Sequence, residues 1–200
     1  MVALVELAYR GEGSRDGWTS EADLIEGQRT DAAMVAEALD RPGAHILLAH
    51  EGEDLIGCCE LQRPRRNAEL VPAGEVGAED ETSQPLHEER KADDPPKQEH
   101  PDGVSEGAAY LGMFSVDPTL QGGGVGKQFL EEAERIARTE WNADAVELTV
   151  IDLRTELIEW YGRRGYEQTG RFKDFPYGNE RFGIPARDDL RLAVLAKPLS

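Results

Sequence analysis

The sequence predicts one domain of the α/β (α+β) class, with about seven strands and about four helices and an acidic insertion. Two observations support this fold class. Along the chain, some short segments have the alternating apolar residues of a strand, and others have apolar residues at helical spacing. Its 200 residues also suit a single domain, 1–200, with enough chain to bury a sizeable core.

The first third of the chain predicts a strand, two helices and a hairpin. Val5, Leu7 and Tyr9 alternate and would share one face of a first strand. Residues 17–43 follow as two short helices, with Thr30 as the N-cap of the second. HILLAHEG and DLIGCCELQ then predict two strands joined as a hairpin.

Residues 63–107 differ from the rest in composition, because they hold many acids and prolines and few large apolar residues. Such a segment buries too little apolar surface to offset the entropy of ordering, so we expect a flexible insertion. It is either an extended hairpin loop or a flap over a substrate.

The elements expected after the insertion alternate between strands and helices. They are a strand at 108–116, a helix from about 125 to 137, a strand at 145–151, a helix at 155–165 and strands at 166–172 and 190–199.

The composition limits the partners. A net charge of −18, from 40 acidic and 22 basic residues, repels nucleic acid and anionic lipid. No basic leader or long apolar span is present, so we expect a cytoplasmic protein without membrane contact. Cys58 and Cys59 are adjacent and would point to opposite faces of a strand, which disfavours a disulfide. The four histidines have no ligand spacing, so no metal is expected.

The segment MFSVDPTLQGGGVGKQFLEEAERIA places a glycine run between a predicted strand and a predicted helix, the usual place for a phosphate loop. The nucleoside triphosphate pattern G-x-x-x-x-G-K-[ST] fails, because Gln121 and Gln128 replace its first glycine and its hydroxyl. The dinucleotide pattern G-x-G-x-x-G fails as well, because its third glycine falls on Lys127 or Phe129.

A third pattern, Q/R-x-x-G-x-G/A, is satisfied by residues 121–126. Here the sequence resembles the GNAT acetyltransferase superfamily, and Phe114-x-Val116-x-Pro118 and Trp160-Tyr161-Gly162-Arg163-Arg164-Gly165-Tyr166 extend the resemblance over about 108–168. The resemblance implies a mixed, mostly antiparallel sheet. It also implies acetyl transfer from the co-substrate acetyl-CoA to a primary amine by direct attack, without an acyl-enzyme.

The residues expected to bind acetyl-CoA follow from this resemblance and from the affinity of backbone amides at a helix start for phosphate. They are Met113, Phe114, Ser115, Val116, Gln121, Gly122, Gly123, Gly124, Val125, Gly126, Lys127 and Arg154. Arg154 departs from the family, since many relatives have asparagine there; arginine either binds a phosphate or projects into solvent.

By the same resemblance, Tyr161 is the general acid that serves the departing thiolate, although an aromatic at this place can also simply pack on a helix face. Glu60 and Tyr110 are candidate bases for the amine proton. No activating partner for Cys58 or Cys59 can be identified, so neither is expected to be a nucleophile.

The acceptor is defined less well. Trp18, Thr19, Phe175 and Tyr177 are candidate acceptor-binding residues, from regions that line the acceptor groove in similar proteins. The acidic surface favours a cationic amine, which could belong to a small molecule, a peptide N-terminus or a lysine, and we expect a small molecule. An acyl-CoA-binding sensor or scaffold without turnover is the alternative, and a homodimer is left open.

Overall fold

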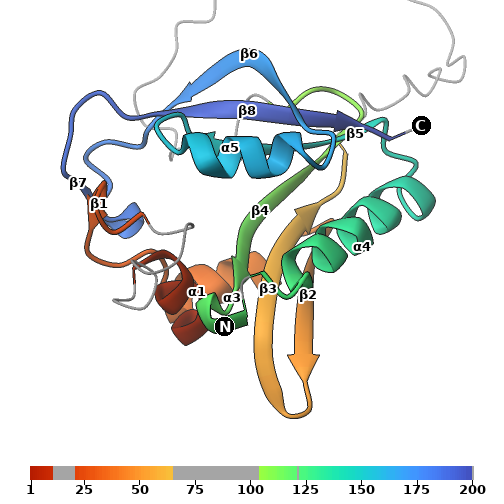
Figure 1. The fold of residues 1–200 in the computed structure, drawn as a ribbon, viewed down its shortest axis with the longest axis horizontal. Coiled ribbons are helices and arrows are strands. Elements are labelled where there is room, and N and C mark those ends of the chain that lie inside the picture. The colour runs from red at the N-terminus through yellow and green to blue at the C-terminus, as the bar shows by residue number, and fades with distance from the viewer. Residues whose placement is uncertain (11–20, 65–103, 121, 200) are drawn as a thin grey trace, which may run out of the picture.

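The computed structural model describes residues 1–10, 21–64, 104–120 and 122–199 (Figure 1). Its α-helices are α1 Val2–Tyr9, α3 Ala32–Leu39, α4 Val125–Thr139 and α5 Thr155–Gly162. Its strands are β1 Ile25–Glu26, β2 Ala44–Glu51, β3 Asp54–Gln62, β4 Ala108–Val116, β5 Ala145–Ile151, β6 Glu167–Asp174, β7 Ile184–Pro185 and β8 Arg191–Pro198. None of the helices within these ranges is long and apolar enough to cross a membrane.

The main sheet has six strands in the order β2-β3-β4-β5-β8-β6. Only the β4–β5 pair is parallel, and the other four pairs are antiparallel. The prediction of a mixed, mostly antiparallel sheet with flanking helices is therefore confirmed. The strand count differs slightly, because β1 and β7 form a separate two-stranded sheet.

The two faces of the sheet carry different helices. The larger core lies under α4 and α5, where Phe129, Leu130 and Tyr161 pack against Cys59 and other buried residues of the sheet. On the opposite face, α1 packs on Cys58. The two cysteines therefore face opposite sides of β3 and are both free, as the strand pattern predicts.

The prediction of a first strand near the N-terminus is wrong, because Val2–Tyr9 forms the helix α1. Leu4, Val5 and Ala8 are the buried residues of α1, which is helical spacing, whereas Leu7 is 39% exposed. An apolar run of this length fits either period, and alanine, leucine and glutamate favour the helix.

The region predicted as two short helices contains one helix in its described part. Residues 21–30 form turns and β1, and α3 then begins after Asp31. Asp31, not Thr30, is the N-cap, since its carboxylate accepts a hydrogen bond of 2.7 Å from the amide of Met34. The amide of Thr30 instead donates to Glu6 at 2.7 Å, which fastens this loop to α1.

β4 and β5 separate soon after they meet. They pair only at Ala108↔Ala145, Ala109↔Val146 and Tyr110↔Glu147, although both strands continue well beyond these residues. Figure 1 shows β4 diverging from β5 towards α1. Beyond Tyr110, the backbone groups on this edge of β4 therefore pair with no other strand in the described part of the chain.

Candidate functional site

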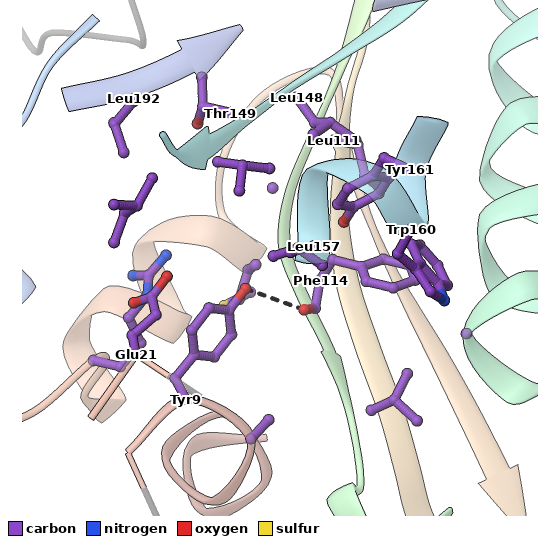
Figure 2. Close-up of a pocket in the computed structure, with 18 of the residues that line it drawn as sticks. Tyr9, Glu21, Leu111, Phe114, Leu148, Thr149, Leu157, Trp160, Tyr161 and Leu192 are labelled. Carbon is purple, nitrogen blue, oxygen red and sulfur yellow. Dashed lines mark hydrogen bonds between the residues drawn. The ribbon is translucent and has the colours of Figure 1, made fainter. Parts of the chain in front are cut away.

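A cavity of about 400 Å³ lies where β4 and β5 diverge (Figure 2). At one end it is lined by the glycine run before α4, and at the other by residues of α1, the β1 region and the loop after β6. Tyr161 and the middle of β4 lie on its wall between these ends.

The glycine end is shaped by two residues with left-handed backbone. Gly122 and Gly124 have φ values of +87° and +88°, a region that glycine adopts without steric cost. A Cβ placed on either glycine would meet no atom of the described residues within 4 Å, apart from its chain neighbours. The space beside these two glycines is thus open to a ligand, and it fits the approach of a phosphate to bare backbone.

The start of α4 offers amides to that space. Gly124 is the N-cap, and the first intrahelical bond runs from the amide of Gln128 to the carbonyl of Gly124. The amides of Val125, Gly126 and Lys127 therefore have no helical acceptor, and the helix dipole favours an anion beside them. The amide of Gly123 is excluded from this role, since it donates to the carbonyl of Leu120 at 3.2 Å. Gln121 lies outside the described residues.

Two cationic side chains line the same end. Lys127 is about 60% exposed and forms an ion pair of 3.5 Å with Glu131. Arg164 stacks on Trp160, its guanidinium carbon 3.5 Å from the ring centre, and donates to the Trp160 carbonyl at 2.7 Å. Burial lowers the pKa of Arg164, and its Nε finds no hydrogen-bond partner among the described residues. Arg164 occupies a variable position of the motif that ends at Tyr166, so sequence reasoning missed it.

β4 carries a bulge at the middle of the cavity. Gly112 pairs with Glu60 and Ser115 with Cys58, so Met113 and Phe114 together oppose Cys59. Met113 has a φ of +50°, which is uncommon outside glycine. The bulge reverses the alternation of the strand, and Phe114 then lies under α4 with the main core.

The bulge also decides which predicted β4 residues reach the cavity. Met113, Phe114 and Val116 line it, whereas Ser115 is buried and pairs with β3. The carbonyl of Phe114 points away from β3 and accepts a hydrogen bond of 3.1 Å from the hydroxyl of Tyr9 (Figure 2).

Tyr161 lies on α5, with its ring held among other aromatic rings. Its centroid is 4.9 Å from that of Trp160, 5.5 Å from Tyr166 and 6.5 Å from Phe114. The residue is only 5% exposed, and burial raises the pKa of its phenol above the ordinary value. Figure 2 shows its hydroxyl turned towards the cavity, where a neutral phenol can donate a hydrogen bond.

The two predicted base candidates lie next to each other but differ in access. Tyr110 lines the cavity, and its hydroxyl shares a hydrogen bond of 3.0 Å with Thr149. Glu60 is buried outside the lining, and its carboxylate pairs with Arg41 at 3.0 Å. Burial raises the pKa of both groups, while Arg41 opposes the shift at Glu60 and Thr149 opposes it at Tyr110.

Among the predicted acceptor-binding residues, Phe175 lines the cavity and is buried. Tyr177 stands behind it, with ring centroids 5.2 Å apart, and its hydroxyl accepts a hydrogen bond of 2.6 Å from the amide of Leu190. Trp18 and Thr19 lie outside the described residues.

Arg154, predicted to bind the cofactor, does not line the cavity. It is the N-cap residue of α5, and its guanidinium lies 3.9 Å from Glu21, a residue of the end opposite the glycine run. Burial lowers the pKa of Arg154, and Glu21 opposes this shift.

Sequence reasoning missed four polar residues at this opposite end: Tyr9, Arg10, Glu21 and Arg29. Arg10 donates to Glu21 at 2.8 Å, and the guanidinium carbon of Arg29 lies 4.9 Å from the centre of the Tyr9 ring. No spacing in the sequence links these residues, because turns and α1 bring them together.

The sequence model of the acetyltransferase (GNAT) family matches residues 14–166, which is most of the chain. This chain therefore belongs to the GNAT family and is an acetyltransferase. None of the curated protein sequences compared with it matches significantly.

Solved structures share the fold at low sequence identity. Naa20 of Chaetomium thermophilum, in complex with a bisubstrate analogue, is 17% identical with a TM-score of 0.54, over 88% of this chain and 76% of that one. The ribosomal-protein-S18-alanine N-acetyltransferase of Escherichia coli is 13% identical with a TM-score of 0.53, over 89% and 83%. The IAA acetyltransferase of Bacillus cereus is 16% identical with a TM-score of 0.52, over 84% and 85%.

Proposed function

We propose that this protein transfers the acetyl group of acetyl-CoA to the primary amine of a small molecule, by direct attack and in the cytoplasm. The observation that carries the proposal is the cavity between the separated strands β4 and β5, which joins the glycine run to Tyr161. It offers one continuous path from the glycine run, where phosphate would bind, to Tyr161, which would act as the donor.

The cofactor would lie along this path. The amides of Val125 to Lys127 would bind its pyrophosphate, with Arg164 adding charge from the side. The pantetheine arm would lie against the free edge of β4, where Phe114 and Val116 face the cavity. The bulge at Met113 interrupts the register with β3 at this point, and a backbone amide there would donate to the thioester oxygen and to the oxyanion that forms on attack.

The reaction forms a C–N bond and breaks the C–S bond, so the amine loses a proton and the thiolate needs a donor. In water, transfer from a phenol of pKa about 10 to a thiolate of pKa about 8.5 is uphill by about 2 kcal/mol. Because burial raises the pKa of Tyr161 further, full transfer becomes harder. Tyr161 would therefore stabilise the leaving thiolate chiefly by donating a hydrogen bond.

The acceptor amine must reach its neutral form. An alkyl amine of pKa about 10.4 is neutral in about one part per thousand near pH 7.4, a deficit of about 4 kcal/mol. Tyr110 and Glu60 remain candidates to take the proton, through water. We add Glu21, the one carboxylate among the described lining residues.

Replacement of Tyr161 by phenylalanine separates turnover from binding. The expected result is a fall in kcat of about tenfold to a hundredfold, with unchanged affinity for acetyl-CoA, since a lost charge-assisted hydrogen bond costs about 1.5–3 kcal/mol. Tyr166→Phe is the matched control, because it removes a neighbouring buried phenol hydroxyl outside the cavity lining.

The alternative is a sensor or scaffold that binds acyl-CoA without turnover. It would bind acetyl-CoA and show no amine acetylation with the unmodified chain. Such a result would refute the catalytic proposal and keep the binding site.

A further inference from the structure

The charge of the cavity is opposite to that of the whole protein. The chain carries a net charge of −18. The charged side chains among the described lining residues are nevertheless four cations, Arg10, Arg29, Lys127 and Arg164, and one acid, Glu21. Lys127 and Arg164 lie beside the glycine run and suit the phosphates of the cofactor. Arg10 and Arg29 lie at the other end, so the cofactor does not account for them.

Arg10 is buried with unused hydrogen-bonding capacity. Its side chain is only 8% exposed, and one of its nitrogens, Nη1, donates to Glu21 at 2.8 Å. Its Nε and Nη2 are also buried, and neither has a hydrogen-bond partner among the described residues. A buried charged donor without an acceptor is costly, and an anionic ligand in the cavity would remove that cost.

Arg29 brings a second guanidinium to the same end, close to the acyl site. It stacks on the ring of Tyr9, with 4.9 Å between its guanidinium carbon and the ring centre. The hydroxyl of that tyrosine donates to the carbonyl of Phe114 at the β4 bulge. A single tyrosine side chain thus spans the distance from the predicted acyl position to Arg29. One small ligand can span the same distance.

The remaining surface at this end is apolar. It is lined by Ile25, Phe175 and Phe182. The first two also belong to a small buried cluster with Ile151, the last residue of β5, and Leu190, the residue before β8. This combination suits a ligand with an apolar body and one anionic group.

We infer that the acceptor is a small primary amine that also carries a carboxylate, with an apolar amino acid as its simplest form. Arg10 and Arg29 bind the carboxylate and the apolar surface around Phe175 holds the side chain, which leaves the amine facing the bulge of β4. The inference rests on the proposed acetyl transfer and replaces the purely cationic amine that the overall charge favours.

The test compares leucine, methionine and phenylalanine with their carboxamides and with the amines that lack the carboxyl group, in full-length protein with acetyl-CoA. We expect kcat/KM for the amino acids to exceed that of both neutral series by at least about tenfold, about 1.4 kcal/mol. Calorimetry adds a binding measurement that does not depend on turnover. We expect N-acetyl amino acids to bind the CoA-loaded protein more tightly than the N-acetyl carboxamides do.

The variants Arg10→Gln and Arg29→Gln should remove most of this preference while the KM for acetyl-CoA stays unchanged, and Arg29→Lys should keep part of it. Arg29 is only half-buried and forms no ion pair within the described ranges, so its variant tests the inference even if Arg10→Gln fails to fold. Arg135→Gln, which removes one positive charge from the exposed face of α4, is the control.

Equal or better use of the neutral series would overturn the inference and leave acetyl transfer standing. The inference also falls if acetyl-CoA binds and no amino acid is acetylated or bound as its N-acetyl form. If acetyl-CoA itself does not bind, the proposed function fails first.

Discussion

Gly124→Ala tests the phosphate cradle through a methyl group placed where the cofactor should lie. The residue has a φ of +88°, a left-handed conformation that is unfavourable for alanine, so the substitution should lower the free energy of unfolding by about 1–2 kcal/mol. Apart from its chain neighbours, a Cβ at this position meets no atom within 4 Å in the part of the chain that the structure describes, so no steric clash with that part adds to the cost. For a domain of this size the substitution should lower Tm by about 2–8 °C.

The same methyl should also weaken the binding of the cofactor. It occupies the approach to the amides of Val125 to Lys127, and losing one charge-assisted hydrogen bond of about 1.5–3 kcal/mol weakens binding at least about tenfold. Gly52→Ala is the matched control, since Gly52 is a left-handed turn residue of the β2–β3 hairpin with φ +62°. Beyond its chain neighbours, its Cβ would likewise meet nothing within 4 Å among the residues described.

Calorimetric titration with acetyl-CoA and thermal unfolding of both variants complete this test. Both should lose similar stability, and only Gly124→Ala should lose affinity. Unchanged affinity in a folded Gly124→Ala protein would show that the open space beside α4 does not hold the cofactor.

Three further predictions follow from the site. Arg164→Gln should weaken acetyl-CoA binding about fivefold to tenfold, measured by calorimetry, because Arg164 is a cation held against the glycine end by Trp160. A Kd that stays the same would remove Arg164 from the cofactor site. Burial raises the pKa of Tyr9 to about 12, so its contribution to stability is complete below about pH 10, the unfolded value, and is lost as the pH rises towards 12. The free energy of unfolding, measured by urea titration, should fall in both proteins between pH 9 and pH 11. The fall should be about 1 kcal/mol smaller in Tyr9→Phe than in the parent protein. Equal falls in the two proteins would contradict this prediction. Of the two carboxylates among the candidate bases, only Glu21 lines the cavity, so Glu21→Gln should change the pH dependence of kcat/KM and Glu60→Gln should leave it as in the parent. A change confined to Glu60→Gln would instead favour Glu60 as the base.

The parts of the fold and site that the sequence predicts well depend on local patterns. The glycine run and the motif around Tyr161 are continuous segments that residue type and order identify, and both contribute residues to the cavity lining, while their roles stay predictions. The apolar spacing of α4 is likewise local, and Phe129, Ala133 and Ile136 are buried as that spacing predicts.

The parts that the sequence misses depend on contacts between distant segments. The helix Val2–Tyr9 packs on Cys58 of β3, a contact between distant segments, and the short apolar run alone does not distinguish the two periods. The end of the cavity opposite the glycine run joins Arg10, Arg29 and Phe175 from three separate regions, and each looks like an ordinary surface or core residue in its own segment. The bulge at Met113 likewise depends on the register with β3.

The central claim is that the cavity between β4 and β5 binds acetyl-CoA. Calorimetric titration of the purified protein with acetyl-CoA, with ATP and NAD as controls, tests it most directly. We predict micromolar binding of acetyl-CoA and none of the two nucleotides. Folded protein that does not bind acetyl-CoA, or that binds ATP or NAD equally well, would contradict the claim and the function proposed from it.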